Sequence, residues 1–148
     1  MNGGSDQTYS GDLSARQAWD LLNETPDATL IDVRTRAEWS YVGTVDLGVL
    51  GKDAVLLEWQ SFPDRQVNPE FVDTLLAELS RRGVGADEPL LFLCRSGVRS
   101  AAAARAVTAA GRDRCYNIAG GFEGGLDADR HRGRLRGWKA ENLPWVQS

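Results

Sequence analysis

Short, mostly apolar runs alternate along the chain with segments whose apolar side chains recur every three or four positions. The runs at 28–33 and 89–93 are typical of strands that are buried on both faces of a sheet. The segments at 14–23 and 68–83 carry apolar residues at helical spacing. This alternation predicts an α/β fold in which helices flank both faces of a central, mostly parallel sheet.

Capping signals place the ends of the two longer helices. Ser14 and Gln17 form a capping-box pair at the start of the first helix. Asn68 is a cap that is followed by proline at the first helical position of the second helix, and Gly83 ends that helix. Weaker patterns predict the remaining elements: a short helix at 34–39, extended segments at 45–50, 54–57 and 115–118, a loop at 59–67, an alanine-rich helix from Ser100 to Gly111, and a last helix at 135–141.

The composition is that of one globular domain. Of 148 residues, 42% are hydrophobic and 26% are charged, which suffices to bury a core without metal ions or disulfides. We expect residues 1–11 to form a flexible tail and residues 12–148 a single domain, while no pattern specifies an oligomeric state. The net charge of −4 argues against nucleic acid as a partner. No run is apolar enough to enter a membrane and the polar start lacks a secretory signal, so we expect a cytoplasmic location.

The chain has two cysteines, Cys94 and Cys115, and one histidine, His131. Two cysteines do not make a disulfide framework, and the spacing of zinc ligands is absent, so we expect neither a metal nor a cofactor. A serine hydrolase would have to use His131, which lies in a Gly/Arg-rich stretch typical of a solvated loop.

Cys94 directly follows the run at 89–93, and open parallel sheets bind ligands beyond the carboxyl ends of their strands. Three effects act on its sulfur. Backbone N–H groups of the loop can form an anion cradle, the next helix adds the positive end of its dipole, and Arg95 and Arg99 add full charges. All three favour the thiolate, which predicts a nucleophilic sulfur. Gly97 permits a positive φ and therefore a tight loop.

Cysteines after apolar strands are often inert core residues. This reading fits Cys115, which has no glycine loop or helix start beside it, and fits Cys94 poorly. Six positions run from Cys94 to Arg99 inclusive, one fewer than in the Cys-x5-Arg loop that wraps a phosphate. A tighter ring of amides suits a smaller charged end, such as the outer sulfur of a persulfide.

Three stretches, LIDVRTRAEWSYVGT, LLFLCRSGVRSAAAARAVTAAG and CYNIAGGFEGGL, resemble the rhodanese-like sulfurtransferase domain. The resemblance covers nearly the whole chain and implies a rhodanese-like fold. It also implies an activity of the thiosulfate sulfurtransferase type, with Cys94 as the catalytic nucleophile. The substrate-binding loop would consist of Arg95, Ser96, Gly97, Val98, Arg99 and Ser100.

The resemblance further implies a reaction. Cys94 takes a sulfane sulfur from a small donor, such as thiosulfate or a mercapto-acid, and passes it through a persulfide to a thiol or cyanide acceptor. Arg95 and Arg99 are candidates to attract the anionic donor, and Arg99 has the alternative role of tying the loop to a carboxylate. We interpret Asp32 and Arg34 as a structural ion pair at a strand end, behind the site.

The chain departs from the family pattern at two places. Gly43-Thr44-Val45 stands where many members have Gly-His-Ile, which we interpret as a change in packing. Residues 126–136 form an extra charged stretch, which we interpret as a plain loop, with a lid and a partner surface as alternatives. Four aromatic residues are candidates both for the pocket mouth and for the core: Trp39, Trp59, Phe62 and Phe122.

Two other functions stay open. A rhodanese-like fold can serve as a non-catalytic binding or regulatory module, and cysteine-dependent phosphatases or arsenate reductases use a related loop. Transfer of sulfur from thiosulfate to cyanide, assayed beside hydrolysis of p-nitrophenyl phosphate, separates these functions from the sulfurtransferase.

Overall fold

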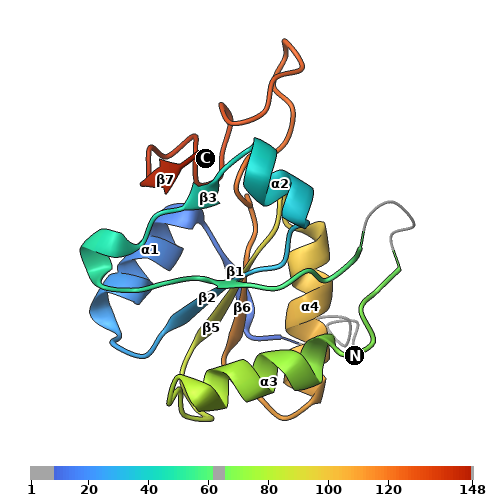
Figure 1. Ribbon diagram of the computed structural model, residues 1–148. Helices are drawn as coiled ribbons and strands as arrows, with labels where there is room; N and C mark the ends of the chain where they lie inside the picture. Colours follow the sequence, from blue (N-terminus) through green and yellow to red (C-terminus); the bar gives the residue numbers. More distant parts are fainter. Residues whose placement is uncertain (1–8, 62–65, 148) are drawn as a thin grey trace.

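Seven strands form two sheets in the computed structural model, which describes residues 9–61 and 66–147. Their bounds are β1 Gly11–Leu13, β2 Thr29–Asp32, β3 Thr44–Val45, β4 Val55–Leu56, β5 Leu90–Leu93, β6 Cys115–Ile118 and β7 Trp145–Val146. Five of them make a parallel sheet in the order β1-β6-β5-β2-β4, and β3 pairs with β7 in a small antiparallel sheet. The central sheet runs through the middle of the molecule (Figure 1).

Helices cover both faces of the central sheet, which confirms the predicted fold class (Figure 1). Their bounds are α1 Ala15–Glu24, α2 Arg36–Tyr41, α3 Phe71–Arg81 and α4 Val98–Ala109, with a 3₁₀ turn, η1, at Gly48–Leu50. Side chains alternate along each strand, so Leu30 packs in the core beneath α1, whereas Ile31 packs against α3 and α4. The fully buried strands β2 and β5 therefore read as continuous apolar runs in the sequence.

Three predicted helix starts are each wrong by two residues. The short helix expected at 34–39 begins at Arg36, because Thr35 caps it. The alanine-rich helix begins at Val98 rather than Ser100, because Gly97 with φ of 114° turns the chain directly into the helix. The helix expected from Pro69 begins at Phe71. The side chain of Asn68 accepts a hydrogen bond from the backbone N–H of Glu70, which makes a separate turn before the helix.

Two further predictions near the small sheet are also wrong. The extended segment expected at 45–50 contains β3 only at its start and continues into η1. The helix expected at 135–141 is a series of turns. Its N–H groups are used elsewhere: Trp138 donates to Gly121 O and Lys139 donates to Phe122 O. Tertiary hydrogen bonds therefore replace the helical ones.

The start of the described chain joins the central sheet. Gly11, which we assigned to the tail, begins β1 and pairs with Tyr116 of β6, while residues 1–8 of that tail lie outside the described residues. Among residues 9–61 and 66–147, no helix is both long and apolar enough to cross a membrane.

Candidate active site

Cys94 lies at the carboxyl end of β5, in the middle of the parallel sheet. Its Sγ accepts a hydrogen bond from the backbone N–H of Gly97 at 3.1 Å, and the Oγ of Ser100 lies 3.2 Å away. The side chain therefore points into the loop that joins β5 to α4, as the sequence predicted. An N–H group and the start of a 12-residue helix both direct positive potential at this sulfur.

The Gly120-Gly121 turn supports this loop from behind. Phe122 donates its N–H to Cys94 O at 2.8 Å, and Glu123 and Gly124 donate to Arg95 O at 3.0 and 3.1 Å. A side chain at Gly121 would collide with the backbone of Cys94 and Arg95, and Gly97 packs as closely against the backbone of Ala119. Glycine is thus required on both sides of the contact, because two backbone segments touch there.

A cavity of about 620 Å³ opens above the sulfur. Only 1% of Cys94 is exposed, so reagents reach the sulfur through this cavity. Of the predicted binding loop, four side chains line the cavity, while Gly97 and Ser100 instead contact Sγ. The residues around the cavity are Thr35, Ala37, Glu38, Val42, Gln60, Ser61, Cys94, Arg95, Ser96, Val98, Arg99, Glu123 and Arg132.

Arg99 ties the loop to a carboxylate, which is one of the two roles considered for it. Its guanidinium binds both carboxylate oxygens of Glu38 in α2, at 2.7 and 3.0 Å. Burial alone would raise the pKa of Glu38, but the hydrogen bonds from Arg99 and Thr35 outweigh it and lower the pKa to about 2. Desolvation likewise opposes the charge of Arg99, and Glu38 outweighs it, so the pKa of Arg99 is raised. The pair stays charged at neutral pH.

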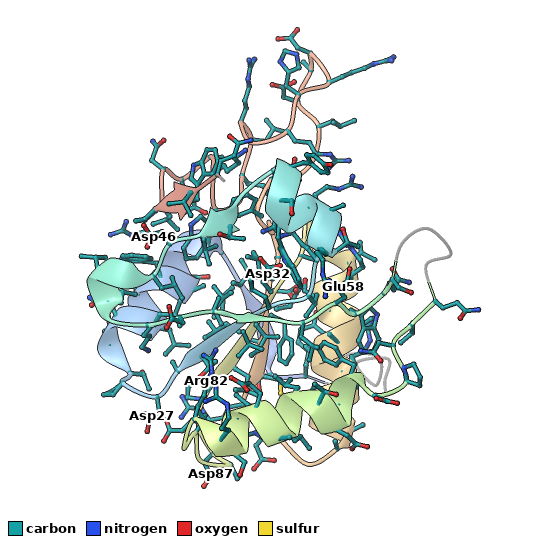
Figure 2. All side chains as sticks on the ribbon, in the orientation of Figure 1. Asp27, Asp32, Asp46, Glu58, Arg82 and Asp87 are labelled. Carbon is teal, nitrogen blue, oxygen red and sulfur yellow. The ribbon has the colours of Figure 1, made fainter. Side chains whose placement is uncertain are left out.

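Asp32 ends β2 near the centre of the molecule (Figure 2). It forms a fully buried ion pair with Arg34. The guanidinium donates to both Asp32 oxygens and to Gly43 O, and it stacks on Phe122 at 4.3 Å from the ring centroid. Asp32 pairs with Leu93, so the ion pair lies one strand away from Cys94, and neither residue lines the cavity. This geometry fits the structural role that the sequence suggested.

The other polar candidates do not gather at the cavity. Cys115 is fully buried at the amino end of β6, and His131 lies on the exposed loop that follows Asp127. In the described part of the chain, no three His, Cys, Asp or Glu side chains are arranged to hold a metal ion. Of the two cysteines, Cys94 lines this cavity and Cys115 does not.

None of the aromatic candidates that the structure describes lines the cavity, and two of them pack in the core. Phe122 is fully buried, and Trp59 packs edge-on against Phe71 with ring centroids 5.0 Å apart. Trp39 is half-buried in α2. Phe62 lies outside the described residues.

Sequence reasoning missed four residues near the sulfur. Glu38 carried a readable signal, since Thr35 and Glu38 have capping-box spacing and the structure contains both bonds. Glu123 and Arg132 line the cavity only because the segment after β6 folds back over it, and no local pattern marks them. Asn117 is buried in β6 and contacts Ser100 across the sheet, which again no local pattern reveals.

Comparison with solved structures identifies the fold as rhodanese-like. The crystal structure of Rv0390 from M. tuberculosis aligns with this chain at 47% identity and a TM-score of 0.81. The alignment covers 95% of this chain and 99% of that protein's chain. A polysulfide-sulfur transferase homodimer from Wolinella succinogenes matches 97% of this chain and 83% of its own, with 26% identity and a TM-score of 0.61. A rhodanese-like domain protein from Staphylococcus aureus shares the fold at 23% identity and a TM-score of 0.50, over 76% of this chain and 87% of its own.

The chain belongs to the family described as STR4 middle domain, whose model matches residues 10–148. The Rickettsia conorii protein named Uncharacterized protein RC0915 is 38% identical over 90% of this chain and 94% of its own. Thiosulfate sulfurtransferase GlpE of Actinobacillus pleuropneumoniae serotype 5b is 30% identical over 76% of this chain and 83% of its own. These relatives confirm the resemblance and place the chain in a sulfurtransferase-type family.

Proposed function

We propose that the protein is a sulfurtransferase that carries a sulfane sulfur as a persulfide on Cys94. The observation that carries this proposal is the position of its Sγ, which faces a large cavity while it accepts the N–H of Gly97. An inert core thiol needs neither the donor nor the opening. The activities named for the GlpE and Wolinella relatives support the same chemistry.

The reaction consists of two displacements. The Cys94 thiolate attacks the outer sulfur of thiosulfate, a new S–S bond forms, and the old S–S bond breaks so that sulfite leaves with the electron pair. An acceptor thiolate or cyanide then attacks the outer sulfur of the Cys94 persulfide. The acceptor keeps that sulfur, and Cys94 leaves as a thiolate, ready for the next donor.

In the proposed cycle, the loop and the charged residues at the cavity have different roles. The N–H of Gly97 stabilises the thiolate of Cys94 each time it forms. The charge of Arg99 is compensated by Glu38, so Arg95 and Arg132 at the cavity attract an anionic donor. Arg99 acts through Glu38 by holding α2 against the loop that contains the sulfur.

Intact-mass spectrometry tests the proposal directly. After exposure to thiosulfate and removal of the reagent, we expect the protein to gain the mass of one sulfur atom. Reductant or cyanide should remove that mass, and peptide mapping should place it on Cys94. A Cys94→Ser variant should not gain it, while Cys115→Ala, the matched control, should. Hydrolysis of p-nitrophenyl phosphate without sulfur uptake would instead support a phosphatase, and neither reaction would support a binding module.

A further inference from the structure

A basic segment borders the cavity, and of its arginines only Arg132 is used in the reaction described above. It follows the Gly120-Gly121 turn and forms the loop that protrudes beyond α2 at the top of the view (Figure 1). Two contacts fix its base: the guanidinium of Arg132 donates to Gly124 O at 2.8 Å, and the N–H of Gly133 donates to Glu123 O. Arg132 and Glu123 both line the cavity, so the loop continues directly from the site of Cys94.

The charge of this loop is opposite to that of the chain. Arginine occupies every second position from Arg130 to Arg136, with no acid between them, in a chain whose net charge is −4. Among the described residues, neither Arg130 nor Arg136 has an ion-pair partner, and both are exposed. Arg134 has Asp127 at 3.7 Å and remains 59% exposed. We name Arg130, Arg134 and Arg136 the basic rim.

We infer that the basic rim docks an acidic protein or peptide that exchanges sulfur with Cys94. The inference rests on the proposed function. Thiosulfate is far smaller than the cavity of about 620 Å³, and none of the three arginines of the basic rim lines that cavity. A larger partner with carboxylates around its cysteine would meet the arginines while its sulfur enters the cavity. Charge complementarity of this kind raises the association rate and selects the partner.

Two cysteine peptides used as acceptors, with thiosulfate as the donor, test the inference. One peptide carries four glutamates around its cysteine, and the other carries four glutamines. We expect kcat/KM for the acidic peptide to exceed that of the neutral one by about tenfold at low ionic strength and to fall steeply with added salt. The triple variant Arg130→Gln/Arg134→Gln/Arg136→Gln should lose this preference and should use cyanide as well as the native protein does.

A matched control removes exposed arginines elsewhere. The variant Arg16→Gln/Arg81→Gln changes two arginines of α1 and α3, whose side chains are 61% and 70% exposed, and should keep the preference. Equal rates for the two peptides with the native protein would overturn the docking surface while cyanide turnover still supports the sulfurtransferase. A single-stranded oligonucleotide that binds the basic rim more tightly than the acidic peptide would also overturn it. Absence of turnover with every acceptor would count against the proposed function itself.

A second, independent observation is a hydrogen-bond chain that runs from Cys94 across the sheet to β1. Ser100 Oγ lies 3.2 Å from Cys94 Sγ and 2.5 Å from Asn117 Oδ1. The Nδ2 of Asn117 donates to Asp12 Oδ1 at 3.1 Å, and Tyr9 donates its hydroxyl to the same oxygen at 2.8 Å. Ser100 and Asn117 are buried, whereas Asp12 is exposed.

The number of protons available in this hydrogen-bond chain determines which group donates to which. The Asp12 carboxylate can only accept, so it fixes the Asn117 amide with the carbonyl oxygen toward Ser100. The Ser100 hydroxyl has one proton and faces two acceptors, Asn117 Oδ1 and the sulfur. When Cys94 is a thiol, its S–H donates to Ser100 Oγ, which donates to Asn117. When Cys94 is a thiolate, the Ser100 hydroxyl must rotate away from Asn117 Oδ1 so that it donates its hydrogen bond to the sulfur.

The geometry points to Asn117 and Asp12 as positioning residues that set the direction of the Ser100 hydroxyl. Asn117 Oδ1 accepts the hydrogen bond of the Ser100 hydroxyl while the sulfur of Cys94 is neutral. It competes with the sulfur for that hydrogen bond when the thiolate forms. Asn117→Leu removes the competitor, so the hydroxyl donates to the sulfur throughout. We expect Asn117→Leu to favour the thiolate and to raise the rate of iodoacetamide alkylation of Cys94 below neutral pH by about fivefold.

The test is the pH profile of alkylation in a double-mutant cycle. The charged groups that face Cys94 around its cavity are Arg95, Arg99, Glu38, Glu123 and Arg132, and they are unchanged in every variant. Asn117→Leu should shift the profile to lower pH in the native background and leave it unchanged in a Ser100→Ala background. An equal shift in both backgrounds, or none in the folded single variant, would overturn the role. Asp12→Ala, at an exposed position, should shift the profile in the same direction and serves if Asn117→Leu does not fold.

Discussion

The two cysteines have opposite surroundings although both are buried in one core cluster. Cys94 is 1% exposed and Cys115 is fully buried, so burial does not separate them. Cys94 follows β5 and its sulfur accepts the N–H of Gly97, whereas Cys115 begins β6 and its sulfur lies 3.7 Å from Arg112 O, a carbonyl oxygen. Burial raises the pKa of Cys115, and a hydrogen bond with Thr108 offsets that only in part.

The end of the sheet, and not burial, therefore distinguishes the electrostatic surroundings of the two sulfurs. In a parallel sheet, loops beyond the carboxyl ends of the strands lead into helix N-termini, where free N–H groups converge. The amino ends receive chains that leave helix C-termini, where carbonyl oxygens face outward. The two cysteine side chains, on adjacent strands, thus lie in electrostatic potentials of opposite sign.

The largest expected effect concerns activity. Cys94→Ser should reduce thiosulfate–cyanide sulfur transfer by about a thousandfold or more, because the nucleophile is lost. Cys115→Ala should change the rate by less than about twofold, since that thiol has no access to the cavity. Initial-rate assays on both variants, with circular dichroism to verify folding, measure the contrast. A comparable loss in Cys115→Ala would show that the comparison assigns the wrong sulfur.

The second expected effect is selective labelling of the thiols. At pH 7.5 or below, the raised pKa of Cys115 keeps that group in its protonated, unreactive form, and burial shields it as well. We expect iodoacetamide to label Cys94 about a hundredfold faster than Cys115 in the folded protein. Peptide mapping after timed quenching measures the ratio. Labelling at equal rates in the folded state, rather than only in denaturant, would contradict it.

The sequence predicted β2, β5 and the position of Cys94 before a glycine-containing loop because these signals are local. β2 and β5 are continuous apolar runs, and Cys94 is followed within three residues by the glycine that turns the chain into α4. The predictions for 135–141 and for Gly11 were wrong because non-local hydrogen bonds decide those segments. Trp138 donates its N–H to Gly121 O in the turn after β6, and Gly11 pairs with Tyr116 of β6. In both cases the partner lies outside the local sequence window.

The candidate site divides in the same way. The loop from Cys94 to Ser100 is contiguous, so its residues could be named from the motif alone. Glu38 and Asn117 approach it from α2 and β6, and their roles depend on how the elements pack. Arg99 illustrates the limit, since its sequence position fits both substrate binding and an ion pair, and only the placement of α2 separates them.

The third prediction separates backbone strain from the contact that holds the loop. Gly97 and Gly111 have nearly equal φ angles of 114° and 113°, but only Gly97 packs against another backbone, that of Ala119. Gly111→Ala should cost about 1–2 kcal/mol of stability through strain alone. Gly97→Ala should cost about 2–4 kcal/mol and reduce sulfur transfer at least about tenfold, because the N–H at Cys94 moves.

Urea unfolding and initial rates on these two glycine variants provide the measurement. Equal losses of stability, with activity retained in Gly97→Ala, would show that close packing of the loop is not what presents the N–H to the sulfur. The two glycine variants therefore compare the closely packed loop at Cys94 with an uncrowded position after the end of α4.

The smallest expected effect concerns the ion pair that holds α2 beside Cys94 and has no counterpart at Cys115. Glu38 has its pKa lowered to about 2 from an ordinary 4.5, so its contribution to stability is fully present above pH 4.5 and is lost as the pH falls toward 2. The partners are about one-fifth exposed, so we expect Glu38→Gln to cost only about 1–2 kcal/mol at pH 7. Urea unfolding at pH 7 and pH 2.5 should show that difference shrinking in acid. A constant difference at both pH values would mean that the amide loses packing or capping of α2, and not the charge of the pair with Arg99.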